Sequence, residues 1–122
     1  MLFRRSKLMA FTLKQSDTYQ WPVVIDIPVD GGRHDRQTFD GEFKRVTQSR
    51  IREMGQLIQE EEITDADLVR EVLVGWTNID DDDGNPVKFS QSTLNQLIDI
   101  PLVATAIATA YFNSMAGVKR KN

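Results

Sequence analysis

The first third of the chain alternates between apolar and polar residues, as half-buried strands do. Apolar side chains recur at every second position over Trp21–Val29, and a similar alternation runs over Gln37–Lys44. A period of two with β-branched and aromatic residues predicts two strands. The glycine-containing turn signal between them predicts an antiparallel hairpin with a loop over residues 30–35. Pro22 and Pro28 cannot donate to a ladder, which predicts an edge position for the first strand.

At Arg45 the pattern changes to a helical period. A first helix is predicted from there to the acidic run Glu60–Glu62, whose charges oppose the negative end of the helix dipole. Thr64 is predicted to cap a second helix that reaches Trp76. The apolar stripe of this second helix consists of Leu68, Val69, Val72, Leu73 and Trp76.

A polar stretch, Gly75–Ser90, separates the second helix from the third. Its consecutive aspartates, Asp80–Asp83, cannot be packed into a core, and Gly84-Asn85-Pro86 forces a turn. Trp76 and Phe89 flank this acidic turn on either side. We therefore predict that these two aromatic side chains anchor the turn to the body of the protein.

Two further helices are predicted in the C-terminal part. Ser90 is the expected N-cap of a short helix, and Pro101 ends it and opens the last helix, Pro101–Met115. The predicted architecture is α+β: an N-terminal antiparallel β-hairpin followed by a bundle of about four α-helices. We expect a single domain over residues 9–117, a disordered extension over residues 1–8 and a basic flexible tail over residues 118–122.

Composition and charge disfavour several classes of function. The chain has 15 basic and 18 acidic residues and a net charge of −3, which disfavours general binding to nucleic acid. No stretch approaches the roughly 20 apolar residues of a membrane span, so no membrane partner is expected. The chain has no cysteine, which excludes disulfides, iron–sulfur clusters and thiolate zinc sites and fits a reducing compartment.

Neither the acidic run nor the single histidine forms a recognisable chemical site. An EF-hand loop placed over the run begins at Ile79 in one register and puts Asn85 at the obligatory glycine in the other, so both registers fail. His34 lies in the predicted loop without a nucleophile motif near it. Motifs for phosphate binding, hydrolysis or metal-dependent proteolysis are missing. We therefore predict a protein that is not an enzyme and has no metal or cofactor.

An ordered set of short motifs occupies the C-terminal half. They are Gly75-Trp76, Asp81–Pro86, Phe89-Ser90, Leu94, Pro101, Ala110-Tyr111-Phe112, Gly117 and Lys121-Asn122. In this order and spacing the motifs resemble those of the tail assembly chaperones of long-tailed bacteriophages, a group similar in role to the lambda tail chaperone. The hairpin that follows Met9 is also similar to those proteins, so the resemblance covers nearly the whole chain after Leu8.

The resemblance implies a non-catalytic assembly factor that acts in the host cytoplasm and is not retained in the mature virion. Such chaperones bind the long, helical, apolar tape-measure protein, keep it soluble and help to recruit tail-tube subunits. In many of these phages a frameshifted longer product contacts the tail-tube protein. The resemblance also implies a homo-oligomer.

An apolar groove with an acidic rim would suit a helical client. The residues predicted to bind the partner lie on the second helix, the acidic turn and the last helix: Leu68, Val72, Trp76, Phe89, Ile107 and Tyr111. Two alternatives stay open. One is a structural tail subunit or head–tail connector or terminator of the virion, and the other is a small regulatory nucleic-acid-binding protein that uses its basic termini.

Overall fold

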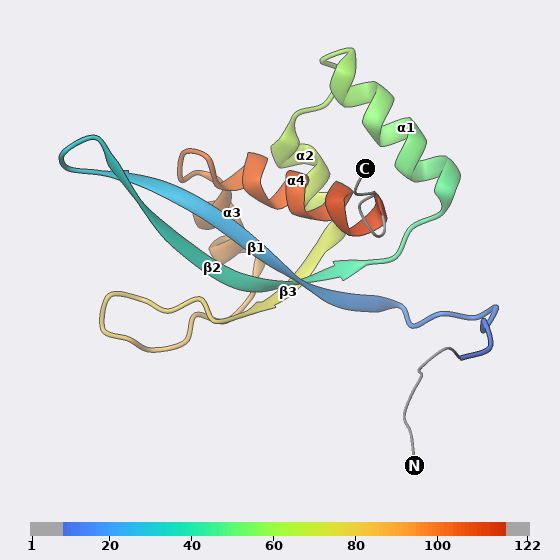
Figure 1. Cartoon of the computed structure of the whole chain (residues 1–122), viewed down its shortest axis with the longest axis horizontal. Coiled ribbons are helices and arrows are strands. Elements are labelled where there is room, and N and C mark those ends of the chain that lie inside the picture. The colour runs from blue at the N-terminus through green and yellow to red at the C-terminus, as the bar shows by residue number, and fades with distance from the viewer. Residues whose placement is uncertain (1–8, 117–122) are drawn as a thin grey trace.

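Three strands and four helices make up the structure, a computed structural model that describes residues 9–116 (Figure 1). The elements are β1 (Thr18–Val29), β2 (Arg33–Lys44), α1 (Gln48–Gln59), α2 (Asp65–Val72), β3 (Leu73–Thr77), α3 (Gln91–Ile98) and α4 (Val103–Ala116). The predicted α+β class and the N-terminal hairpin are confirmed. The extension over residues 1–8 and the tail over residues 118–122 lie outside the described residues.

The hairpin is longer, and its loop shorter, than the sequence pattern predicts. β1 and β2 pair without interruption from Thr18 opposite Lys44 to Val29 opposite Arg33. Only residues 30–32 form the turn, because Gly31 (φ 84°) and Gly32 (φ 74°) both occupy the left-handed region that glycine adopts at no steric cost. The loop was predicted over residues 30–35, but it ends at residue 32, because β2 starts at Arg33. His34 lies in β2 and is exposed.

A third strand replaces the end of the predicted second helix. α2 ends at Val72, and β3 pairs antiparallel with the free side of β2 in the sheet order β1-β2-β3. Leu73 already has extended dihedrals (φ −90°, ψ 116°). A Cβ atom at Gly75 would lie 2.6 Å from Glu42 Oε1, so glycine is what lets β3 approach β2 closely. The prediction of a helix to Trp76 was wrong because pairing with a distant strand overrode the helical apolar spacing.

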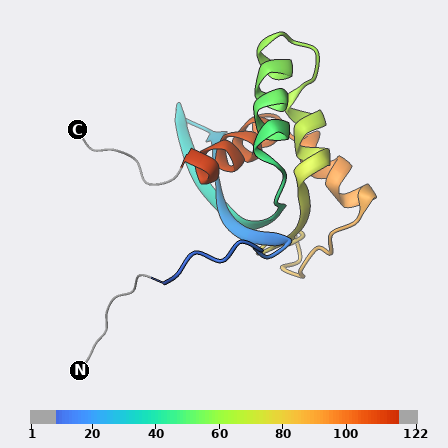
Figure 2. The ribbon, with the colours of Figure 1, turned by 90° about the vertical axis from the view of Figure 1, so that its right-hand side faces the viewer.

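The sheet curves around α4, which packs against β1, while α2 packs against α4 (Figure 2). The core is apolar, and its fully buried large side chains include Val23, Phe43, Met54, Leu68, Leu94, Ile107 and Tyr111. α1 projects from the body and contributes only Met54 to the buried residues (Figure 1). The helices therefore do not form a clear bundle as predicted: α4 packs on β1, α2 and α3 pack on α4, and α1 projects from the body.

Helix ends follow the capping rules, with one exception. Thr64 and Ser90 form reciprocal capping boxes as N-caps of α2 and α3, as their positions predict. α1 ends at the acidic run, also as predicted. α4 starts at Val103 instead of Pro101, because Leu102 has a φ of 77° that cannot continue a right-handed helix. Among the described residues, no single helix is long and apolar enough to cross a membrane; α3 and α4 reach that length only as a pair bent by 101°.

Candidate functional site

Trp76 and Phe89 anchor the acidic turn, as the sequence predicts. Their ring centroids lie 4.8 Å apart in an edge-to-face arrangement at 72°. The indole Nε1 of Trp76 also donates a hydrogen bond of 2.8 Å to the carbonyl oxygen of Val87. Both ends of the turn are therefore held against each other by side chains that are only half buried.

The tip of the turn is built around one carboxylate. Asp81 Oδ1 accepts hydrogen bonds of 2.9 Å from the backbone N–H groups of Asp83 and Asn85. Gly84 has a φ of 83°, as a turn glycine should. Asp81, Asp82 and Asp83 bring carboxylate oxygens within 4.8 Å of one another, and all three are exposed. Asp81 already accepts hydrogen bonds that hold the turn, and Asp82 and Asp83 face solvent. We therefore interpret the cluster as part of a solvated turn.

Beside this turn lies a groove made of two adjoining hollows, with volumes of about 390 and 260 Å³. The hollows share Ile79, Asp80, Leu97 and Ile100 as common lining. The larger hollow is completed by the hairpin, by the residue after β3 and by the start of α4: Ile25, Ile27, Gln37, Thr38, Phe39, Asn78 and Val103. The smaller hollow is completed by the turn and α3 through Trp76, Asp81, Asp82, Val87, Thr93 and Gln96. We call the two hollows together the groove.

One wall of the groove is an unpaired strand edge. β3 pairs with β2 only from Asp40 to Phe43, whereas β1 pairs with the whole of β2. Among residues 9–116, the outer side of β2 over Arg33–Phe39 therefore has no strand beside it. Gln37, Thr38 and Phe39 line the groove along this edge. Unpaired N–H and C=O groups of such an edge are ready to pair with another chain.

The predicted partner-binding residues divide between the core and the groove. Leu68, Val72, Ile107 and Tyr111 are fully buried in the core. In this conformation these four side chains support the groove from within the core and are not accessible to a partner. Trp76 lies in the groove wall and Phe89 packs on it. That the six residues bind a partner stays a prediction.

Sequence reasoning missed the residues at the centre of the groove. Ile79, Leu97 and Ile100 come from the turn, from α3 and from the α3–α4 connection, so no single pattern joins them. The one local signal was Ile100 next to Pro101, an apolar residue in a connection that the structure leaves 47% exposed. The unpaired edge of β2 gave no signal, because it depends on where β3 ends.

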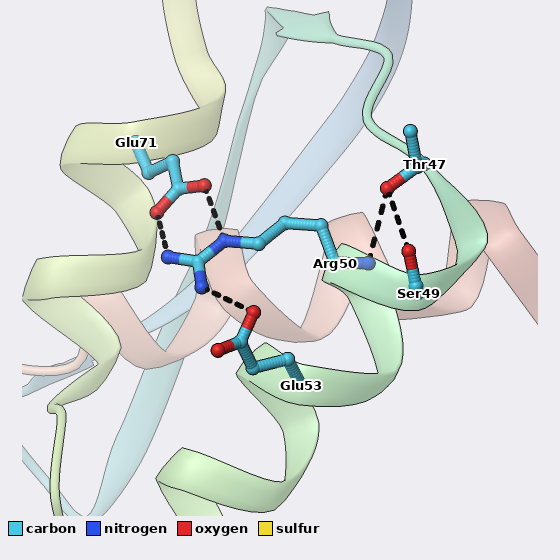
Figure 3. A network of polar contacts seen from close by, with 5 residues as sticks. All are labelled: Thr47, Ser49, Arg50, Glu53 and Glu71. Carbon is cyan, nitrogen blue, oxygen red and sulfur yellow. Dashed lines mark hydrogen bonds and ion pairs between the residues drawn. The ribbon is translucent and has the colours of Figure 1, made fainter.

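A polar network joins α1 to α2 (Figure 3). The Arg50 guanidinium donates to both carboxylate oxygens of Glu71, at 2.8 and 2.6 Å, and to Glu53 at 2.8 Å. Its hydrogen bonds lower the pKa of the Glu71 carboxyl, and Glu71 in turn raises the pKa of Arg50. The network attaches the projecting helix, so we assign it to the fold.

An apolar groove with an acidic rim and an open strand edge has features that suit a polypeptide ligand. Helices dock on apolar grooves and extended segments add to strand edges, so both kinds of protein ligand suit it. Within residues 9–116 the titratable side chains around it come from the turn and all face solvent. The groove and the open edge together have the chemistry of a surface suited to protein ligands.

The chain belongs to the phage tail assembly chaperone family, whose model matches residues 9–122, nearly the whole chain. This match confirms the resemblance drawn from the sequence motifs. No curated protein and no solved structure matches the chain. Family membership supports the general role of a chaperone with protein partners in tail assembly, and it suggests a protein that is not catalytic.

Proposed function

We propose that this chaperone binds the tape-measure protein through the groove, keeps it soluble and helps to recruit tail-tube subunits during tail morphogenesis. It acts in the host cytoplasm, self-associates and leaves before the virion is mature. Contact with the tail-tube protein through a frameshifted longer product belongs to the same proposal. The observation that carries the proposal is the groove itself, on a chain that belongs to the tail assembly chaperone family.

The groove suits a long, helical, apolar client for two reasons. Its floor of Ile79, Leu97 and Ile100 offers apolar surface that an amphipathic helix would remove from water. Its rim at Asp80–Asp82 carries negative charge, which favours client segments with basic residues beside the apolar face. The same charge opposes close approach of two rims and so limits nonspecific aggregation.

The test is co-expression with the tape-measure protein, measuring how much of that client stays soluble. The wild-type chain should raise the soluble fraction, and Ile100→Asp should remove most of the gain because a carboxylate on the groove floor repels an apolar helix. Val24→Asp is the matched control, since Val24 is 46% exposed and lies outside the groove whereas Ile100 is 47% exposed within it. Equal client solubility with both variants would contradict the assignment of the groove.

A second measurement separates a chaperone from a component of the particle. Mass spectrometry of purified virions should find the tail-tube and tape-measure proteins and lack this chain. If the chain is present at a fixed ratio to tail-tube subunits, it is a structural subunit and the proposal fails.

A further inference from the structure

The segment Met9–Leu13 exposes apolar side chains that no other part of residues 9–116 covers. Met9, Phe11 and Leu13 are 88%, 82% and 91% exposed, more than any apolar side chain of the folded body. They alternate with Ala10 and Thr12, which is the pattern of a strand with one buried face. We call this segment the arm. It extends from the start of β1, at the end of the hairpin opposite the turn (Figure 1).

The groove has the features that such an arm needs. The outer edge of β2 over Arg33–Phe39 has unpaired backbone groups, and the larger hollow beside it is lined by Ile27, Phe39 and Ile100. An extended segment that adds to a strand edge gains main-chain hydrogen bonds and places alternate side chains in the adjoining hollows. The arm therefore presents the backbone and the side-chain period that this site requires.

Charge favours the same pairing. Lys14 follows the arm directly, and the sequence before it contains Arg4, Arg5 and Lys7. The groove carries the exposed acidic rim Asp80–Asp82. Opposite charges at the two surfaces favour an encounter between arm and groove.

The sheet topology assigns the arm to a neighbouring copy. The arm leaves the hairpin at the end where Thr18 pairs with Lys44, whereas the open edge of β2 runs from Phe39 to Arg33. Between the two, β3 occupies the outer side of β2 over Asp40–Phe43. To pair with the open edge of its own copy, the arm would have to reverse its direction and pass over β3. The arm of another copy can approach the same edge without crossing β3.

We propose that the arm of one copy adds as a fourth strand to the outer edge of β2 in a second copy, with Phe11 and Leu13 in the groove. The contact joins two different surfaces, so it propagates head to tail and produces rings or open filaments instead of closed pairs. It gives a surface to the self-association included in the proposed function. Both surfaces belong to this chain, so the contact forms without client; because the arm fills part of the groove proposed for the client, arm and client compete for it.

Sedimentation of the purified full chain, without client, tests the contact. The wild type should associate, and the double variant Phe11→Asp, Leu13→Asp should weaken association at least about tenfold. The double variant Ala10→Asp, Thr12→Asp adds the same charge to the other face of the arm and should associate nearly as the wild type does. All four positions are exposed, so folding should be unaffected, as thermal unfolding will show.

Disulfide trapping fixes the location, because the chain has no cysteine of its own. A chain with Thr12→Cys mixed with a chain with Thr38→Cys should form a crosslinked pair of unlike chains under mild oxidation. Replacing the second chain by one with Gln20→Cys, on β1, should abolish that product, since Gln20 is exposed but far from the open edge.

Each outcome separates this inference from the proposed function. A wild-type chain that stays monomeric at its solubility limit overturns both the arm contact and self-association. Association that persists in the Phe11→Asp, Leu13→Asp variant, or crosslinking that is equal at Thr38→Cys and Gln20→Cys, overturns the arm contact alone. Client solubilisation without any self-association would leave the client proposal standing.

Discussion

The two halves of the hairpin differ although they share the same two strands and one uninterrupted register. In the near half, which ends at the start of β1, β2 has β1 on one side and β3 on the other over Asp40–Phe43. Phe43 is fully buried there, with its ring centroid 5.4 Å from that of Tyr111 on α4. Backbone pairing on both sides and a covering helix make this half the centre of the fold.

In the far half, β1 is the only strand beside β2 within the part of the chain that the structure describes, and every side chain over Arg33–Thr38 is exposed. Asp26 and Arg36 form a cross-strand ion pair of 3.1 Å in open solvent, a contact that contributes little to stability. What this half offers is an open strand edge beside an apolar groove. One hairpin thus has β2 between two strands at one end and an open β2 edge at the other end, while Ile25 of β1 keeps the far half packed on the core.

The strongest test of this comparison truncates a side chain in each half. Phe43→Ala should lower the free energy of unfolding by about 3–5 kcal/mol, because it leaves a cavity against Tyr111. Val24→Ala, in the far half, should change it by no more than about 0.5 kcal/mol. Urea denaturation measures both. If the two substitutions have similar effects, the halves do not differ as described.

Local signals predicted the parts of this molecule that depend on neighbouring residues. Thr64 and Ser90 were identified as N-caps because a cap needs only the next turn of chain. Trp76 and Phe89 were identified as anchors because they bracket a stretch that cannot be buried. The edge position of β1 followed from its two prolines, and the sheet order confirms it.

The parts that depend on distant residues could not be predicted in this way. Residues 73–77 have an apolar spacing that suits a helix, and they become β3 only because β2 offers an edge and Gly75 allows close approach. The open edge and the groove then follow from the point where β3 ends. Leu68 and Ile107 could be recognised as apolar helix positions from the sequence, whereas their choice as partner-binding residues met full burial in the core.

Two tyrosine substitutions in the near half should have smaller effects, of opposite sign, on the free energy of unfolding. The Tyr111 hydroxyl is buried without a hydrogen-bond partner among the described residues, and burial raises the pKa of Tyr111 to about 12. Tyr111→Phe should therefore raise the free energy of unfolding by about 1 kcal/mol. Tyr19→Phe should lower it by about 1 kcal/mol, because it removes the 2.7 Å hydrogen bond between Tyr19 and Ser114. Loss of stability in both variants would mean that the Tyr111 hydroxyl is satisfied in solution.

The smallest expected effect concerns α1, whose attachment combines the buried Met54 with the polar network around Arg50. Arg50 lowers the pKa of Glu71 below its usual 4.5, so the ionised carboxylate is favoured in the folded state. The stability that this pair contributes is present above about pH 4.5 and is lost as the pH falls through the lowered pKa of the folded state. The difference in unfolding free energy between wild type and Glu71→Gln should therefore be largest near pH 7 and shrink towards pH 3. Urea denaturation across that range measures it, with Glu62→Gln, an exposed carboxylate outside the network, as the reference substitution. A difference that stays constant over the range would show that the Arg50–Glu71 pair does not hold α1 in solution.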